Sequence, residues 1–291
     1  NIFKRFNSAR VYINNNVIKR RTMKKIAVVM SIYINDKIEY VSKAVDSILQ
    51  QTFPDFDYYI QYDGIINNDV DKYLQSIADQ RIKIYKRTDN KGLAQSLNDL
   101  LKIVLPLNYE FIARMDADDI SLPQRFEEQI VYFQQHPKIE CLGTWAEEIK
   151  YNGDTFFLKK MPITHHECYQ LFQQRDCLIH PTVMFRHSFF EKAGRYDTTT
   201  FFAEDTMLWA QGFKAGCIFG NVPQYLYKFR LDEHFFDRRR GWKYAKGIWQ
   251  TRVRVNKMLH FGISAYVGAL LYATAKMMPQ WLLNILYKTM R

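Results

Sequence analysis

From Ile26 onward, short apolar runs rich in β-forming residues alternate with stretches of helical periodicity, and this alternation is the strongest constraint on the fold. A rhythm of this kind builds a mostly parallel sheet with helices on both faces, because parallel strands need a crossover connection. The sequence therefore predicts an α/β fold with a Rossmann-like, mostly parallel central sheet flanked by helices. The expected strands are residues 26–32, 58–62, 82–85 and 111–115, and the expected helices are residues 37–51, 70–79 and 93–105.

The second half of the chain is less regular, and its pattern predicts mixed strands. Asn152-Gly153-Asp154 indicates a hairpin turn. Ser121 is a candidate N-cap for a helix that ends at Gln135. Beyond Arg238 the pattern is helical throughout, with a basic stretch followed by an apolar one. The other expected elements are extended runs at residues 179–185 and 225–230 and a helix at residues 204–215.

Polar and acidic residues follow three of the predicted strands, where the strands end. They are the segment 33–36, Asp63 and the segment 116–119. Ligands of open α/β sheets bind at the carboxyl ends of the strands. Carboxylates gathered at such an end suit Mg²⁺ or Mn²⁺, which take hard oxygen ligands. Two alternatives stay open: a solvated acidic turn, and a phosphatase with an aspartate nucleophile, which Ile120 at the fifth place of the motif disfavours.

Several segments, taken together and in order, resemble family 2 glycosyltransferases of the GT-A fold, in the branch that builds bacterial capsule, exopolysaccharide and lipopolysaccharide. The resemblance runs from about Ile26 to Arg230. The matching segments are the opening strand (26–33), the first helix (44–52), Asp63-Gly64, Asn90-Lys91-Gly92-Leu93-Ala94, Arg114 to Asp119, His180-Pro181-Thr182, and Glu204-Asp205 with Leu208-Trp209. This resemblance implies transfer of a sugar from a nucleotide-sugar donor.

The resemblance also implies a donor site on the first half of the chain. Tyr33 and Asp63 would contact the base and Asp116 the ribose, and Arg114 could add a positive charge near the phosphates or form an ion pair with one of these aspartates. Because Tyr62 stands where the family often has a second aspartate, base recognition falls on Asp63 alone, or Tyr62 stacks on the base. The expected nucleotide-sugar residues are Ser31, Tyr33, Asp63, Asn90, Gly92, Arg114 and Asp116.

The implied metal ion, Mn²⁺ or Mg²⁺, would be held by Asp118 with Asp116. The family often adds a histidine after an aromatic-arginine pair, and here Asp232 and His234 follow Phe229-Arg230, so either is a candidate ligand. Bound metal would stabilise the departing nucleotide diphosphate as a Lewis acid.

The implied catalytic base is Asp205, with Glu204 as the fallback. A carboxylate there would take the proton of the acceptor hydroxyl during attack opposite the leaving group, which implies inversion. The alternative is an acidic pair that only stabilises a helix N-terminus. His180 is a candidate contact for donor or acceptor, and otherwise a structural histidine.

Positive charge is concentrated at the two ends of the chain. Residues 1–25 carry eight basic side chains and no acidic one, and residues 238–291 carry eleven and none, so the middle has 22 basic groups against 30 acidic ones. Basic ends beside apolar segments suit an anionic membrane surface better than nucleic acid. The apolar stretch 261–275 is shorter than the roughly 20 residues needed to cross a bilayer, which favours an in-plane helix pair over a span, with a core helix as the alternative.

These observations predict three parts: a basic extension (1–22), a GT-A catalytic domain (23–237) and a helical, membrane-associating segment (238–291). Four cysteines without metal-ligand spacing and the lack of a signal-peptide pattern favour a cytoplasmic protein, peripherally bound to the inner face of the bacterial membrane. The expected acceptor is a glycan or a lipid-linked sugar. Two other functions stay open: a nucleotide-sugar nucleotidyltransferase, which would want a glycine-rich loop after the first strand, and a non-catalytic membrane-bound partner.

Overall fold

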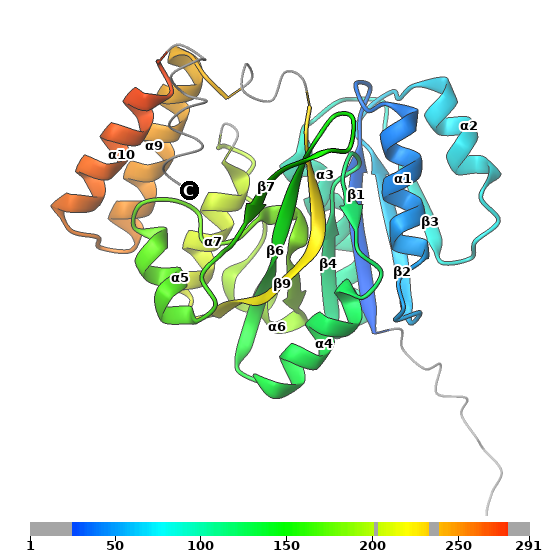
Figure 1. Cartoon of the computed structure of the whole chain (residues 1–291), viewed down its shortest axis with the longest axis horizontal. Helices are drawn as coiled ribbons and strands as arrows, with labels where there is room; N and C mark the ends of the chain where they lie inside the picture. The colour runs from blue at the N-terminus through cyan, green and yellow to red at the C-terminus, as the bar shows by residue number, and fades with distance from the viewer. Residues whose placement is uncertain (1–24, 201–202, 233–238, 279–291) are drawn as a thin grey trace, which may run out of the picture.

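The computed structural model of the protein describes residues 25–200, 203–232 and 239–278. Within these residues the strands form one sheet in the order β3-β2-β1-β4-β8-β6-β9-β5, with β7 paired to β6 (Figure 1). The strands are β1 (Ile26–Ile32), β2 (Phe56–Tyr62), β3 (Ile82–Lys86), β4 (Phe111–Met115), β5 (Ile120–Ser121), β6 (Ile139–Lys150), β7 (Thr155–Lys159), β8 (Met184–Arg186) and β9 (Ile218–Leu231).

The first half of the sheet is parallel, as predicted from the alternation of strands and helices. β1 lies between β2 and β4 and pairs in parallel with both, and β2 pairs in parallel with β3. The chain order therefore reverses at β1, and a reversal of this kind opens a crevice at the carboxyl ends of the strands. The second half is mixed: β8 is antiparallel to β4 and β6, whereas β9 runs parallel to β6.

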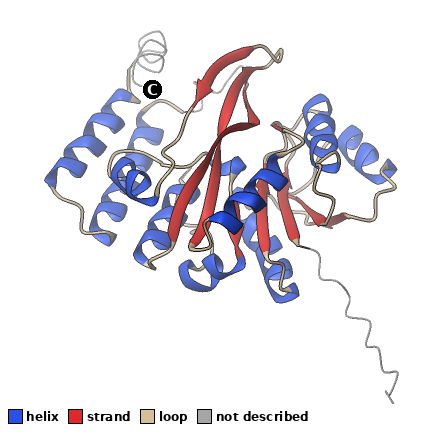
Figure 2. Cartoon of the chain, turned by 60° about the horizontal axis from the view of Figure 1, so that its bottom comes forward, coloured by secondary structure: helices blue, strands red, loops and turns tan. Residues whose placement is uncertain are grey.

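Helices cover both faces of the sheet (Figure 2). Alternate residues of β1 point to opposite faces, so that Val28 and Met30 join one hydrophobic cluster and Ala27 and Val29 join the other. The α-helices are α1 (Ile38–Leu49), α2 (Asn68–Ser76), α3 (Leu93–Val104), α4 (Arg125–Gln135), α5 (His165–Phe172), α6 (His187–Ala193), α7 (Glu204–Lys214), α9 (Trp242–Met258) and α10 (Ile263–Ala275), and the short 3-10 helices are η1 (Leu105–Leu107) and η2 (His180–Thr182).

The prediction that Ser121 caps the next helix is wrong. Ser121 lies in β5 and pairs with Tyr227 of β9, and α4 begins only at Arg125. The start of α4 is held instead by Gln51, whose Oε1 accepts a hydrogen bond from the Phe126 backbone amide at 3.1 Å. The extended run expected at residues 179–185 is also interrupted, because η2 occupies its middle. The hairpin at Gly153 is confirmed and joins β6 to β7.

The last two described helices stand at the end of the molecule opposite α2 (Figure 1). α9 packs against α7, and α10 packs against α9. α10 turns Ala265, Ala269 and Ala273 inward, while Ile263, Val267, Leu270 and Leu271 on the same helix are exposed. In the part of the chain that the structure describes, no helix combines the length and the apolar character that a bilayer span requires. All four cysteines (Cys141, Cys168, Cys177 and Cys217) are buried free thiols.

Candidate active site

The carboxyl ends of β1, β2 and β4 meet at one edge of the sheet, as expected. The backbone amide of Asp63, directly after β2, donates a hydrogen bond to the Ile32 carbonyl at the end of β1, at 2.7 Å. Ser31 lies in β1, half-buried, and Tyr33 follows at its end with its amide hydrogen-bonded to Asp36 at 2.9 Å. Ser31, Tyr33 and Asp63 therefore lie near the same ends of neighbouring parallel strands.

Asp63 is buried and held in position by residues on the loop after β3. Its Oδ1 accepts hydrogen bonds from the Lys91 amide, at 2.7 Å, and from the guanidinium of Arg87. Arg87 in turn bonds Asp99, at 2.7 Å, and the Ser96 hydroxyl, at 2.8 Å. Sequence reasoning missed Arg87, although its place just before the Asn90 segment was a usable signal.

Two glycines allow the backbone to close around Asp63. Gly64 has a φ of +86°, and a Cβ there would stand 2.9 Å from the Asn90 amide nitrogen, so only glycine fits this approach. The Asn90 side chain donates to the Asp63 carbonyl at 3.3 Å. Gly92, with a φ of +85°, precedes the first residue of α3. Asn90 and Gly92 therefore shape the loop that carries Asp63.

Three carboxylates gather directly after β4. Oxygen atoms of Asp116, Asp118 and Asp119 lie within 4.8 Å of one another. Burial, followed by the charge of Asp116, raises the pKa of Asp118 to about 7, and burial raises that of Asp119 well above its usual range. Oδ2 of Asp119 is buried and has no hydrogen-bond partner within residues 25–200, 203–232 and 239–278. A divalent cation fits this cluster, because it would offset the mutual repulsion and satisfy the unpaired oxygen.

Arg230 of β9 fixes the geometry of the acidic cluster. Its backbone amide donates to Asp119 Oδ1 at 2.6 Å, and its Nε donates to the Asp118 carbonyl at 2.8 Å. Asp119, which was not among the predicted metal ligands, is thus partly committed to the protein. Asp232 lies close enough to raise the pKa of Asp118 further, and His234 lies outside the described residues.

Arg114 forms an ion pair with Asp116. Its side chain is 1% exposed, and Nη1 lies 2.5 Å from Asp116 Oδ1. Nε and Nη2 of Arg114 are buried and have no hydrogen-bond partner among the described residues. The ion pair that sequence reasoning left open is therefore present.

Glu204 and Asp205 open α7, and electrostatics connect them to the acidic cluster. Burial raises the pKa of Glu204, and the nearby charges of Arg114 and Asp116 act on it in opposite directions. Burial, followed by the charges of Asp176 and Glu204, raises the pKa of Asp205 to about 8. Asp205 is half-buried, and its Oδ1 accepts a hydrogen bond from the Thr206 amide at 2.7 Å.

Two other candidates are buried beside the site. His180 is 8% exposed, and its Nε2 lies 2.8 Å from the Tyr196 hydroxyl. Burial lowers the pKa of His180 well below its usual range, so the ring is neutral. Tyr62 is 3% exposed and donates its hydroxyl to Asp71 of α2 at 2.9 Å, an arrangement that does not favour stacking on a base.

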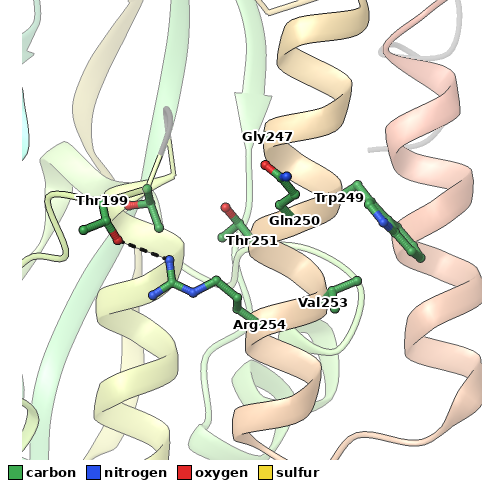
Figure 3. Close-up of a pocket in the computed structure, with 8 residues that line it drawn as sticks. Thr199, Gly247, Trp249, Gln250, Thr251, Val253 and Arg254 are labelled. Atoms are coloured by element: carbon green, nitrogen blue, oxygen red, sulfur yellow. Dashed lines mark hydrogen bonds between the residues drawn. The ribbon is translucent and has the colours of Figure 1, made fainter.

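A pocket lies between the turn at Thr199-Thr200 and α9 (Figure 3). Among the described residues of its lining, Arg254 is the one ionisable side chain, and this arginine is already bonded to Asp197 at 2.6 Å. The pocket shares no residue with the acidic cluster.

A parallel half-sheet that ends in a held aspartate and an acidic cluster, joined to a mixed half-sheet, is the GT-A arrangement of glycosyltransferases. Residues 27–194 match the family described as "Glycosyl transferase family 2". The chain belongs to this family and is a glycosyltransferase. Its fold also resembles a mannosyltransferase from Pyrobaculum calidifontis, solved with GDP-Man and Mn²⁺, at a TM-score of 0.59 and 13% identity, over 91% of this chain and 79% of that one.

Two of the named relatives are bacterial glycosyltransferases. The amylovoran biosynthesis glycosyltransferase AmsE of Erwinia amylovora is 28% identical over 264 residues, covering 90% of this chain and 97% of that protein. The UDP-Gal:alpha-D-GlcNAc-diphosphoundecaprenol beta-1,3-galactosyltransferase of Escherichia coli is 29% identical over 223 residues, covering 76% and 79%.

Proposed function

We propose that the protein is an inverting, metal-dependent transferase that moves a sugar from a UDP-sugar to a glycan or lipid-linked acceptor in cell-surface polysaccharide or lipopolysaccharide synthesis. One observation supports the proposal: the held Asp63 and the cluster after β4 follow strands of one parallel half-sheet, and the charges of Arg114 and Asp116 act on Glu204 at the start of α7. A donor bound there would reach from a base subsite, through its diphosphate, to a basic carboxylate.

The donor site would use Ser31, Tyr33 and Asp63 for the nucleoside. Asn90 and Gly92 would hold the loop around Asp63. The E. coli relative's name gives a UDP-sugar, whereas the solved mannosyltransferase carries GDP-Man. We favour UDP, because the relative with the named UDP-sugar shares more sequence with this chain.

A divalent cation, Mn²⁺ or Mg²⁺, would be held by Asp118 and Asp116, with Asp119 Oδ2 and the unplaced His234 as further candidates. The chemistry that the cation supplies when bound is stabilisation of the diphosphate as it departs. The free Nε and Nη2 donors of Arg114 would add fixed positive charge on the protein side of the same group.

Asp205 would act as the base. The acceptor oxygen forms a bond to the anomeric carbon, its proton passes to Asp205, and the bond from that carbon to the diphosphate oxygen breaks, which inverts the configuration. Glu204 is the fallback base. We keep His180 as a candidate contact in the acceptor half, where a neutral ring could donate or accept one hydrogen bond.

An enzyme that acts on a lipid-linked acceptor must work at the membrane surface, and the C-terminal segment has features suited to binding that surface. Residues 238–291 carry eleven basic groups and no acidic one, and α10 exposes four aliphatic side chains. We therefore propose that residues 23–237 form the catalytic domain and that residues 238–291 attach it peripherally to the anionic inner face of the bacterial cytoplasmic membrane. Deleting residues 261–291 should release the protein from membranes, and unchanged sedimentation with membranes would contradict this.

The test of the catalytic proposal is calorimetric titration with UDP-, GDP-, CMP- and TDP-sugars, with and without Mn²⁺. We expect one nucleotide class to bind only when metal is present. Asp118→Ala should abolish this metal-dependent binding. Glu191→Ala, which removes a carboxylate that is 67% exposed on α6, is the matched control and should bind as wild type. If no donor binds in the presence of metal, the protein is a non-catalytic partner; release of pyrophosphate from a nucleoside triphosphate and a sugar phosphate would indicate a nucleotidyltransferase.

A further inference from the structure

Helix α9 is connected to the proposed base by a chain of polar contacts. Arg252 of α9 donates from Nη2 to Asp176 Oδ1 at 3.0 Å. The same oxygen accepts the Thr206 hydroxyl at 2.9 Å. The Thr206 amide donates to Asp205 Oδ1 at 2.7 Å. Three side chains from three separate segments therefore join α9 to Asp205.

The chain is fixed rather than loosely attached. Arg252 and Thr206 are each 4% exposed. A second donor of Arg252 reaches the Phe172 carbonyl at 3.0 Å, and the guanidinium lies over the Phe172 ring, 5.2 Å from its centre. A buried guanidinium with two bonded groups has one orientation, and its removal would leave Asp176 without its cation.

This arrangement engages one of the two carboxylate oxygens of Asp205. Among the described residues, hydrogen bonds reach Asp205 only at Oδ1, from Thr206. Oδ2 is left to accept a proton. Asp176 accepts the Thr206 hydroxyl, which fixes the rotamer of this side chain, while the Thr206 backbone amide holds Asp205 Oδ1.

Several charged groups face Asp205 from the elements around it. Asp176, in the segment between α5 and η2, and Glu204 on α7 oppose its negative charge, whereas Arg239, ahead of α9, favours it. Two tyrosines, Tyr196 between α6 and α7 and Tyr244 on α9, also interact with it. Arg252 acts on Asp205 indirectly, by neutralising Asp176.

We propose that Asp176 and Arg252 are positioning residues for Asp205, so that α9 is part of the catalytic apparatus as well as part of the membrane-attachment segment. The inference rests on the proposed role of Asp205 as the base. It predicts that the two partners of one ion pair have opposite effects on the reaction. Loss of Asp176 removes a negative charge near the base, and loss of Arg252 exposes that charge.

The experiment measures kcat/KM for sugar transfer against pH, and donor affinity by calorimetry, for Asp176→Asn, Arg252→Met and Arg252→Lys in the full chain. Asp176→Asn should move the acidic limb to lower pH by roughly half a unit or more, which raises kcat/KM on that limb about threefold. Arg252→Met should move the limb to higher pH by a similar amount, and Arg252→Lys should restore it at least in part. The donor Kd should stay within about twofold, because neither residue contacts the donor site.

Arg254→Met is the matched control. It removes an arginine from the same helix that pairs with Asp197 rather than with Asp176, so the limb should stay in place. Limbs that do not move, or that move in the same direction in Asp176→Asn and Arg252→Met, would overturn the inference. If the circular dichroism of Arg252→Met shows that it does not fold, the shift of the acidic limb in Asp176→Asn alone tests the inference. Asparagine keeps a side-chain oxygen that can accept the Thr206 hydroxyl. Asp205→Asn separates the two proposals: if it retains activity, the assignment of the base is wrong, whatever the limbs show.

Discussion

Replacing Leu270 and Leu271 with serine should weaken binding of the protein to anionic vesicles by about ten- to a hundredfold. Leu270 is 51% exposed and Leu271 65% exposed, so the pair exposes slightly more than one whole leucine side chain. Moving one such side chain out of water contributes about 1.5 to 3 kcal/mol, and each 1.4 kcal/mol is a factor of about ten in affinity. Because both side chains are exposed, the substitution should leave the stability of the fold nearly unchanged.

The assay is co-sedimentation with vesicles of phosphatidylglycerol and phosphatidylcholine, at low and high salt. The matched control is Val131→Ser with Leu158→Ser, which removes two aliphatic side chains of similar exposure, 41% and 51%, from α4 and β7. Wild-type binding should fall as salt rises, because basic residues near an anionic surface add about 1 kcal/mol each and salt screens them. If the two double variants bind equally, the exposed face of α10 does not enter the membrane, and the reasoning is refuted.

Three further results are expected. The kcat/KM of the wild type should rise with pH on a limb near pH 8, because Asp205 must lose its proton to act as base and its pKa is raised to about 8. The variant Asp205→Asn should lose this limb together with most of the activity. A wild-type limb below pH 6 would contradict the assignment. Gly64→Ala should lower the free energy of unfolding in urea by about 2 to 4 kcal/mol, since the new Cβ adds strain at positive φ and stands 2.9 Å from the Asn90 amide nitrogen. The control Gly153→Ala, whose Cβ would have no other atom within 4 Å, should cost only about 1 kcal/mol from strain. Equal losses in the two variants would refute the close approach at Gly64. Arg87→Met should raise the Kd for UDP about tenfold, because it releases Asp63. The control Lys86→Met breaks an exposed ion pair with Asp71 and should leave this Kd unchanged. Equal affinities for the two variants would remove Arg87 from the donor site.

Local patterns were enough to predict the parallel half of the sheet. The strand expected at residues 111–115 has the same bounds in the structure, because every residue in it is buried and a charged residue stands on each side. α3 begins at Leu93 as expected, since its apolar residues recur at helical spacing behind a glycine. Parallel topology alone predicts that Asp63 and the acidic cluster, which follow β2 and β4, lie at the same edge of the sheet.

Long-range pairing explains what the sequence could not predict. Ser121 looks like a helix cap until β9, more than a hundred residues later, pairs with it. β9 was expected only at residues 225–230 but runs from Ile218 to Leu231, because β6 supplies a partner along its whole length. The contact between Arg252 and Asp176 spans 76 residues of sequence, and no spacing rule connects them.

The four buried cysteines have a practical consequence for experiments on this enzyme. Thiol reagents react with exposed thiolates, and each native thiol is enclosed in the protein, with the pKa of Cys141 and Cys177 raised further by burial. A single cysteine introduced at exposed Lys246 on α9 would therefore be labelled selectively in the folded state, without first removing the native ones. An environment-sensitive fluorophore attached there would report, in real time and on an otherwise native chain, when this end of the molecule meets a lipid surface.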